Sequence, residues 1–105
     1  MDDIRNTIPS CALDDAGMAA QRERHRRLAP GVSELTREPE AVVVEFTAGF
    51  DRAALDEMVA VEQRCCPFFR FAFDDHARRL SVTVAEPEML PALDAIHEAL
   101  AAARA

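Results

Sequence analysis

Two adjacent cysteines, Cys65 and Cys66, lie in the segment EQRCCPFFRF, with Glu62 one helical turn upstream. Adjacent cysteines pair badly in a disulfide, because their Cα atoms are about 3.8 Å apart, closer than ordinary disulfide geometry prefers. We therefore expect two thiols in the resting protein, which leaves apolar filler, metal ligand or nucleophile as their roles. As ligands, paired thiolates select soft ions such as Cu(I), Hg(II), Zn(II) and trivalent arsenic.

The number of ligands separates these candidate ions. Two neighbouring thiols provide a linear or bent site, and a third sulfur from Cys11 would make a trigonal site suited to arsenite or Hg(II). Adding His25 would give the Cys₃His set typical of structural zinc, although the spacing matches no C-x₂-C zinc pattern. A lone cysteine is usually a small buried hydrophobe, and the residues alone favour that interpretation for Cys11.

The position of the pair favours ion binding over unaided thiol catalysis. A helix C-terminus carries partial negative charge, which makes a thiol there a sluggish nucleophile, whereas a bound cation displaces the thiol proton directly. An enzyme remains an alternative: in an organometal lyase, Cys65 and Cys66 would hold the metal while Glu62 delivers a proton to the leaving carbon. A structural or interaction module, with the cysteines as core filler, is the other alternative.

The segment from about Asp14 to Leu28 is predicted to be a helix, capped by Asp14 and ended by the sequence APG. Met18 and Leu28 mark its expected inward side. Gln21 and His25 fall on the same stripe, so this helix turns polar groups toward the core.

A second helix is predicted from about Arg52, after an Asp51 cap, and must end by Cys66 because a residue before proline is pushed out of the helical region. Its apolar face includes Leu55 and Met58 and has Glu62 near its centre. Burying a carboxylate without a partner costs several kcal/mol, so Glu62 needs a compensating group.

The two helices are therefore expected to enclose one cavity, which contains Glu62, the thiols, Gln21 and His25. Arg24 would lie at its edge as a counter-ion. The alternatives are a structural salt bridge from Glu62 to Arg24 or Arg70, and a packing role for His25.

The remaining elements predict an α+β fold. A first hairpin is predicted from strands at 32–37 and 41–47 around the sequence EPE, the second of them rich in valine and phenylalanine. Alternating apolar residues indicate a second hairpin with strands at about 69–73 and 80–84, and a last helix starts between Pro87 and Pro91. The order αββαββα favours a four-stranded antiparallel sheet with helices packed on one face, without specifying the strand order. Residues 1–10 are expected to form a flexible arm and residues 11–105 a single domain.

The composition of the chain limits the classes of partner that we expect it to bind. The 105 residues carry a formal charge of −7 and every basic residue is arginine, which makes the chain a poor binder of phosphate backbones, so nucleic acid is not expected. No apolar run approaches the roughly 20 residues that span a bilayer, and the first ten residues lack a secretion-signal profile. We expect a cytoplasmic protein without membrane contact, whose partner is a metal ion or a small thiophilic ligand.

The segments CALDDAGMAAQRERHRRL and VEQRCCPFF resemble a group of small bacterial proteins with an N-terminal C-x-L element and an E-x-x-C-C-P-F signature. The resemblance covers most of the chain from Cys11 to about Leu100. These proteins are associated with heavy-metal and arsenic resistance genes, which implies a metal-related role. The shared pattern marks Cys11 and Glu62 together with the cysteine pair, and places Gln21 toward the site.

Overall fold

The computed structural model describes residues 14–104, and the predicted N-terminal arm and Cys11 lie outside this range. The element order αββαββα is confirmed. The helices are α2 (Asp15–Leu28), α3 (Arg52–Cys65) and α4 (Pro91–Arg104), and the strands are β1 (Val32–Glu38), β2 (Ala41–Phe46), β3 (Phe69–Asp74) and β4 (Arg79–Val84). Short 3₁₀ turns, Ala29–Gly31 and Pro87–Met89, precede β1 and α4.

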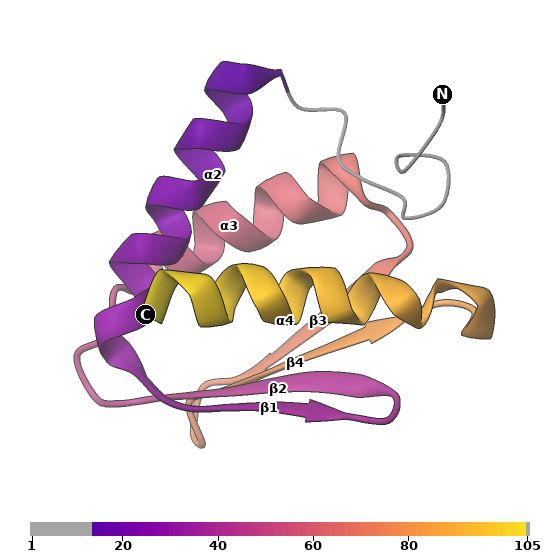
Figure 1. Ribbon diagram of the computed structural model, residues 1–105. Helices are drawn as coiled ribbons and strands as arrows, with labels where there is room; N and C mark the ends of the chain where they lie inside the picture. The colour runs from indigo at the N-terminus through magenta and orange to yellow at the C-terminus, as the bar shows by residue number, and fades with distance from the viewer. Residues whose placement is uncertain (1–13, 105) are drawn as a thin grey trace.

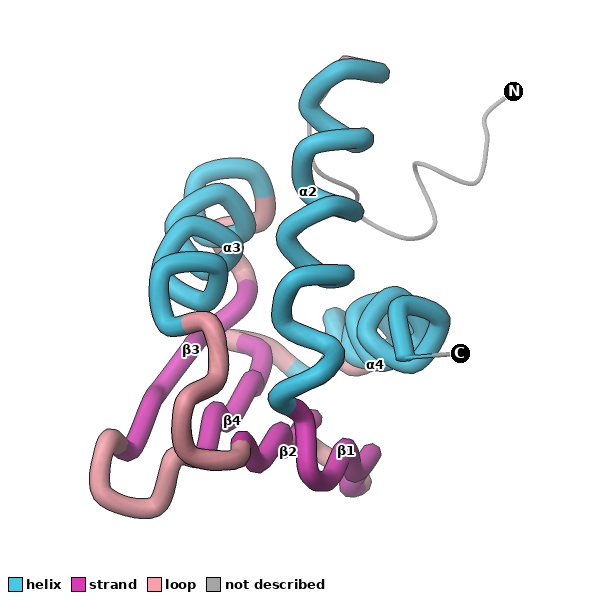
Figure 2. Tube along the Cα trace, turned by 90° about the vertical axis from the view of Figure 1, so that its left-hand side faces the viewer, coloured by secondary structure: helices cyan, strands magenta, loops and turns pink. Residues whose placement is uncertain are grey.

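The two hairpins join into one antiparallel sheet with the strand order β1-β2-β4-β3. The second strands of the hairpins pair at the centre, where Val42 lies opposite Val82 and Val44 lies opposite Leu80. All three helices lie on the same face of this sheet, as Figures 1 and 2 show. The predicted α+β architecture is therefore confirmed.

The core lies between the sheet and the helices. Alternate residues of the strands point toward the helices because successive side chains in a strand face opposite sides. The buried strand residues are Val42, Val44, Phe46, Phe69, Leu80 and Val82, and the buried helix residues include Leu28, Leu55, Met58, Leu93, Ile96 and Leu100. The apolar residues of α3 and α4 recur at helical spacing, so each helix presents one stripe to the sheet.

The predicted start of α2 is confirmed, but its predicted inward side is partly wrong. The side chain of Asp14 accepts a hydrogen bond from the Gly17 amide at 2.7 Å, as an N-cap does. Gln21, His25 and Leu28 are buried as expected, whereas Met18 is 42% exposed. The reason is visible in Figures 1 and 2, where the N-terminal half of α2 extends beyond α3 and the sheet.

Candidate functional site

The cysteine pair lies where α3 ends and the chain turns into β3. The Cys66 amide donates to the Glu62 carbonyl at 2.6 Å, which closes the last turn of the helix. The Phe69 amide then donates to the Cys66 carbonyl at 3.1 Å, so residues 66–69 form a tight turn with Pro67 at its second position. Cys66 is buried and Cys65 is half-buried. The pair is thus held by backbone hydrogen bonds on both sides, with the first thiol closer to the surface.

Glu62 is buried on the inner side of α3, with only 8% of its surface exposed, as the sequence predicts. The side-chain amide of Gln21 in α2 donates to Glu62 Oε2 at 3.0 Å and to the Met58 carbonyl at 3.1 Å. Both amide hydrogens of Gln21 are thereby used on α3. The carboxyl group receives a compensating donor from the neighbouring helix, which meets part of the cost of burying it.

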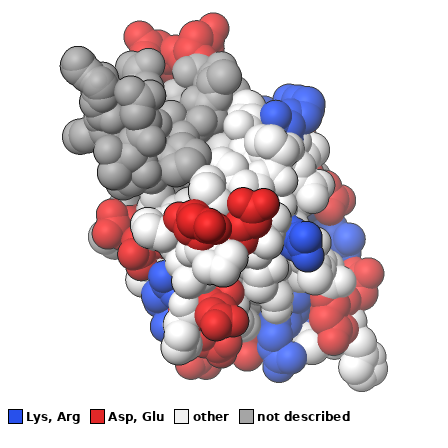
Figure 3. Space-filling view, turned by 90° about the vertical axis from the view of Figure 1, so that its right-hand side faces the viewer, with Lys and Arg blue, Asp and Glu red and all other residues white. Residues whose placement is uncertain are grey.

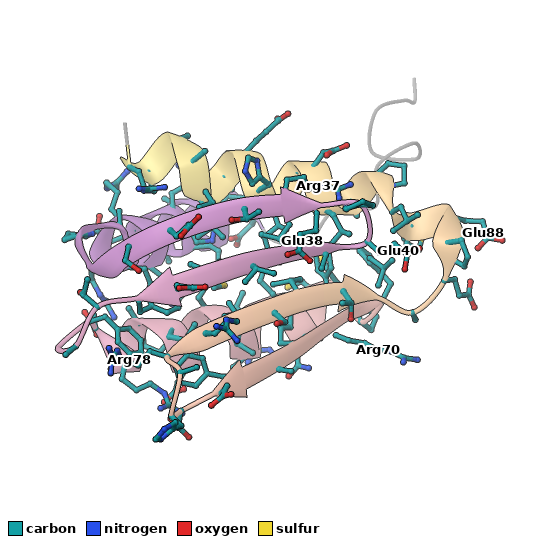
Figure 4. All side chains as sticks on the ribbon, turned by 90° about the horizontal axis from the view of Figure 1, so that it is seen from below. Arg37, Glu38, Glu40, Arg70, Arg78 and Glu88 are labelled. Atoms are coloured by element: carbon teal, nitrogen blue, oxygen red, sulfur yellow. The ribbon has the colours of Figure 1, made fainter. Side chains whose placement is uncertain are left out.

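Arg24 reaches Glu62 indirectly, through Gln21. Its Nη1 donates to Gln21 Oε1 at 2.9 Å, and its Nε lies 3.4 Å from Glu57 Oε1. Because the Gln21 carbonyl accepts from Arg24 while its amino group donates to α3, the orientation of this amide is determined from both ends. Arg70, the other proposed partner of Glu62, is exposed on β3 and points away from the helices (Figure 4).

His25 is buried one helical turn after Gln21, and its Nε2 has no hydrogen-bond partner among the residues that the structure describes. Buried polar atoms without a partner are rare in proteins, so this nitrogen is an exception to be explained. Burial lowers the pKa of His25 and the charge of Arg24 lowers it further, while the charge of Glu62 acts in the opposite direction. The neutral imidazole is therefore the favoured form in the folded protein.

This burial predicts that acid destabilises the protein through His25. The folded state disfavours the charged imidazole, so below the ordinary histidine pKa of about 6.5 the unfolded chain binds the proton first. The free energy of unfolding then falls as the pH decreases from 6.5 toward the lowered pKa, by at most about 1.4 kcal/mol per pH unit from this group.

Replacing His25 with leucine should remove this dependence, measured by urea unfolding between pH 7.5 and pH 5. The matched control is His76→Leu, because His76 is exposed in the β3–β4 turn. An equal dependence of the free energy of unfolding on pH in the wild-type protein and in His25→Leu would contradict this role of His25.

The described residues bring Gln21 and Glu62 together and link Arg24 to them through Gln21, and they leave the set of metal ligands open. Within residues 14–104, no three histidine, cysteine, aspartate or glutamate side chains are grouped so as to hold a metal ion. Cys11 lies outside these residues, so a site of three sulfurs stays a prediction. Sequence reasoning did not identify Glu57 as the partner of Arg24, because an exposed acid on a helix carries no periodic signal.

No protein-family model, curated protein or solved structure matches this chain. Among residues 14–104, no helix combines the length and the apolar character needed to cross a bilayer.

Proposed function

We propose that the protein binds a soft, thiophilic metal or metalloid ion through Cys65 and Cys66, with Cys11 as a third sulfur ligand. The observation that carries the proposal is the end of α3, where backbone hydrogen bonds fix Cys66 directly after Cys65, one helical turn beyond the buried Glu62. The ion is the cargo, taken up in the cytoplasm for sequestration, delivery or resistance. Hg(II) and arsenite suit three sulfurs, Cu(I) suits two, and zinc would require His25 as a fourth ligand.

The residues around the pair support this role in different ways. Glu62 lies one turn before the thiols on the same helix, where its negative charge favours a nearby cation. Gln21 and Arg24 hold the carboxyl group in place through the hydrogen bonds described above. The half-buried Cys65 offers an entering ion a first ligand, and the buried Cys66 offers a second ligand away from competing water.

The charge of the protein also favours a cation over nucleic acid. The chain carries a net charge of −7, and acidic side chains are prominent on the face drawn in Figure 3, which is the right-hand side of Figure 1. A field of this sign concentrates cations and repels phosphate backbones.

Native mass spectrometry of anaerobically purified protein tests the proposal. The protein is offered Hg(II), arsenite, Cu(I) and Zn(II) in competition. One ion per chain is expected, with the thiophilic ions displacing zinc. A chain that retains none of the four ions would refute ion binding.

A second candidate function, organometal lyase, is favoured by the fixed position of Glu62. Its Oε2 accepts a hydrogen bond from Gln21, which fixes the orientation of the carboxyl group. In the reaction, two thiolates bind the mercury of an alkylmercury compound, the carbon–mercury bond breaks, and the proton of Glu62 forms the new carbon–hydrogen bond. The products are a hydrocarbon and Hg(II) bound to the thiolates, and no oxidant or reductant is needed.

Gas chromatography of the headspace over the protein and ethylmercury separates the two functions. A lyase releases ethane, and Glu62→Gln abolishes the release while mercury stays bound. A binding protein takes up the mercury compound and releases no ethane.

A further inference from the structure

The outer edge of β3 differs from the other edge of the sheet. Among residues 14–104, no strand pairs with this edge, and Figure 4 shows β3 as the outermost strand. Its six residues, FRFAFD, contain no proline or glycine, and they pair with β4 without a shift in register. Such an edge presents unpaired backbone groups that can pair with another chain.

The opposite edge, β1, has the features that normally prevent such pairing. Its register with β2 shifts between Val32 and Glu34, which interrupts the regular strand. The charge of Arg37 on this edge is already paired, because its Nε lies 2.9 Å from Asp94 Oδ1 of α4. β3 therefore provides the regular edge that is available for pairing.

The charges of β3 are arranged so that the strand complements itself. Arg70, Ala72 and Asp74 are exposed on the face away from the helices. Arg70 makes no ion pair with any of the described residues, which leaves its charge available. Asp74 is held in place because its Oδ1 accepts from the amides of His76 and Ala77 at 2.9 and 3.0 Å. In an antiparallel pair of identical strands, a positive end thus meets a negative end.

We propose that β3 pairs with β3 of a second copy of this chain, antiparallel and centred on Ala72, to form a symmetric dimer with one continuous sheet. In this register Arg70 of each copy lies directly opposite Asp74 of the other copy. On the helix side, Phe71 lies opposite Phe73 of the second copy. Each contact occurs twice, as a two-fold interface requires.

The charges select this register among the alternatives. Residues directly opposite each other in an antiparallel pair point to the same face of the sheet. An alternative register must therefore also place residues of the same face opposite each other. Centring the pair on Phe71 places Arg70 against Ala72, and centring it on Phe73 places Asp74 against Ala72. Only the Ala72-centred arrangement pairs both charges.

The aromatic side chains on the helix face support the same interface. Phe71 and Phe73 are only half-buried in one copy, although both point to the apolar side of the sheet. The guanidinium group of Arg52 lies 4.6 Å from the centre of the Phe73 ring and covers part of it. A second copy would cover the aromatic edges that α3 leaves exposed.

Charge reversal tests the dimer, with multi-angle light scattering during gel filtration as the measurement. A reductant and a chelator exclude disulfide or metal bridges. The wild-type chain should have the mass of two chains. Arg70→Asp and Asp74→Arg should each be monomeric, because each homodimer would contain only like-charged pairs. A mixture of the two variants should form a one-to-one heterodimer, in which both charge pairs are restored.

Two further variants separate this interface from general charge effects. Ala72→Lys places two lysines opposite each other at the centre without touching the turn after β3, and should be monomeric. Arg22→Asp makes the same charge change on an exposed position of α2 and should leave the dimer intact. A monomeric wild-type chain, a dimer that survives Arg70→Asp or Ala72→Lys, or a dimer lost in Arg22→Asp would overturn the proposal. Circular dichroism checks that each variant is folded. If Asp74→Arg is unfolded, Arg70→Asp and Ala72→Lys still test the interface.

Discussion

Alanine at either Cys65 or Cys66 is expected to lower the affinity for Hg(II) or arsenite by about 100-fold or more. The reason is chelation: once one thiolate holds the ion, the second acts within the same molecule and at a high effective concentration. The two variants should lose affinity to a similar extent, because each leaves a single thiolate of the pair. Competition with a thiol chelator of known affinity measures the loss.

The matched control for this loss is Met18→Leu. Met18 is a sulfur-containing side chain on the exposed part of α2, and its replacement should leave the affinity unchanged. Alanine also avoids the buried hydroxyl that serine would introduce at Cys66. Wild-type affinity in the Cys66→Ala variant, with the fold intact, would exclude the pair as the binding site.

Leucine at Gln21 is expected to lower the free energy of unfolding by about 2–4 kcal/mol. The change removes the donor to Glu62 Oε2 and the donor to the Met58 carbonyl, and it leaves both acceptors in an apolar interface without these bonds. Arg24 also loses its acceptor on Gln21. Urea unfolding at pH 7.5 measures the effect.

Two comparisons make this prediction specific. Gln63→Leu makes the same chemical change at an exposed position of α3 and should alter stability by less than about 0.5 kcal/mol. The double variant Gln21→Leu/Glu62→Leu should be more stable than Gln21→Leu alone, because it replaces the donor and the acceptor of this hydrogen bond together by apolar groups. Additive losses in the double variant would show that Gln21 and Glu62 do not interact.

Local signals in the sequence predicted most of the fold. Asp14 and Asp51 cap the two helices as expected, each accepting from a backbone amide three residues later. Proline after Cys66 ends α3, and the alternation of apolar residues defines the inward face of β3 and β4. These features depend on neighbouring residues, so the sequence alone reveals them. The strand order depends on how two hairpins meet, and no local pattern encodes that contact.

The site was predicted less completely, because it also depends on contacts between elements that are distant in the sequence. The inward position of Glu62 and Gln21 follows from helical spacing and is confirmed, whereas the inward position of Met18 is wrong. Spacing gives the side of a helix on which a residue lies, but not how far the covering layer extends along the helix. The link from Arg24 through Gln21 to Glu62 joins two helices, and its geometry arises only when they pack.

X-ray absorption spectroscopy at the edge of the bound ion, with arsenite or Hg(II) loaded anaerobically, shows directly whether Cys65 and Cys66 coordinate the ion through sulfur. Two sulfur neighbours are expected from Cys65 and Cys66, and three if Cys11 joins them. Alanine at Cys65 or Cys66 should remove one of them. A bound ion surrounded by oxygen or nitrogen alone would contradict the thiolate site.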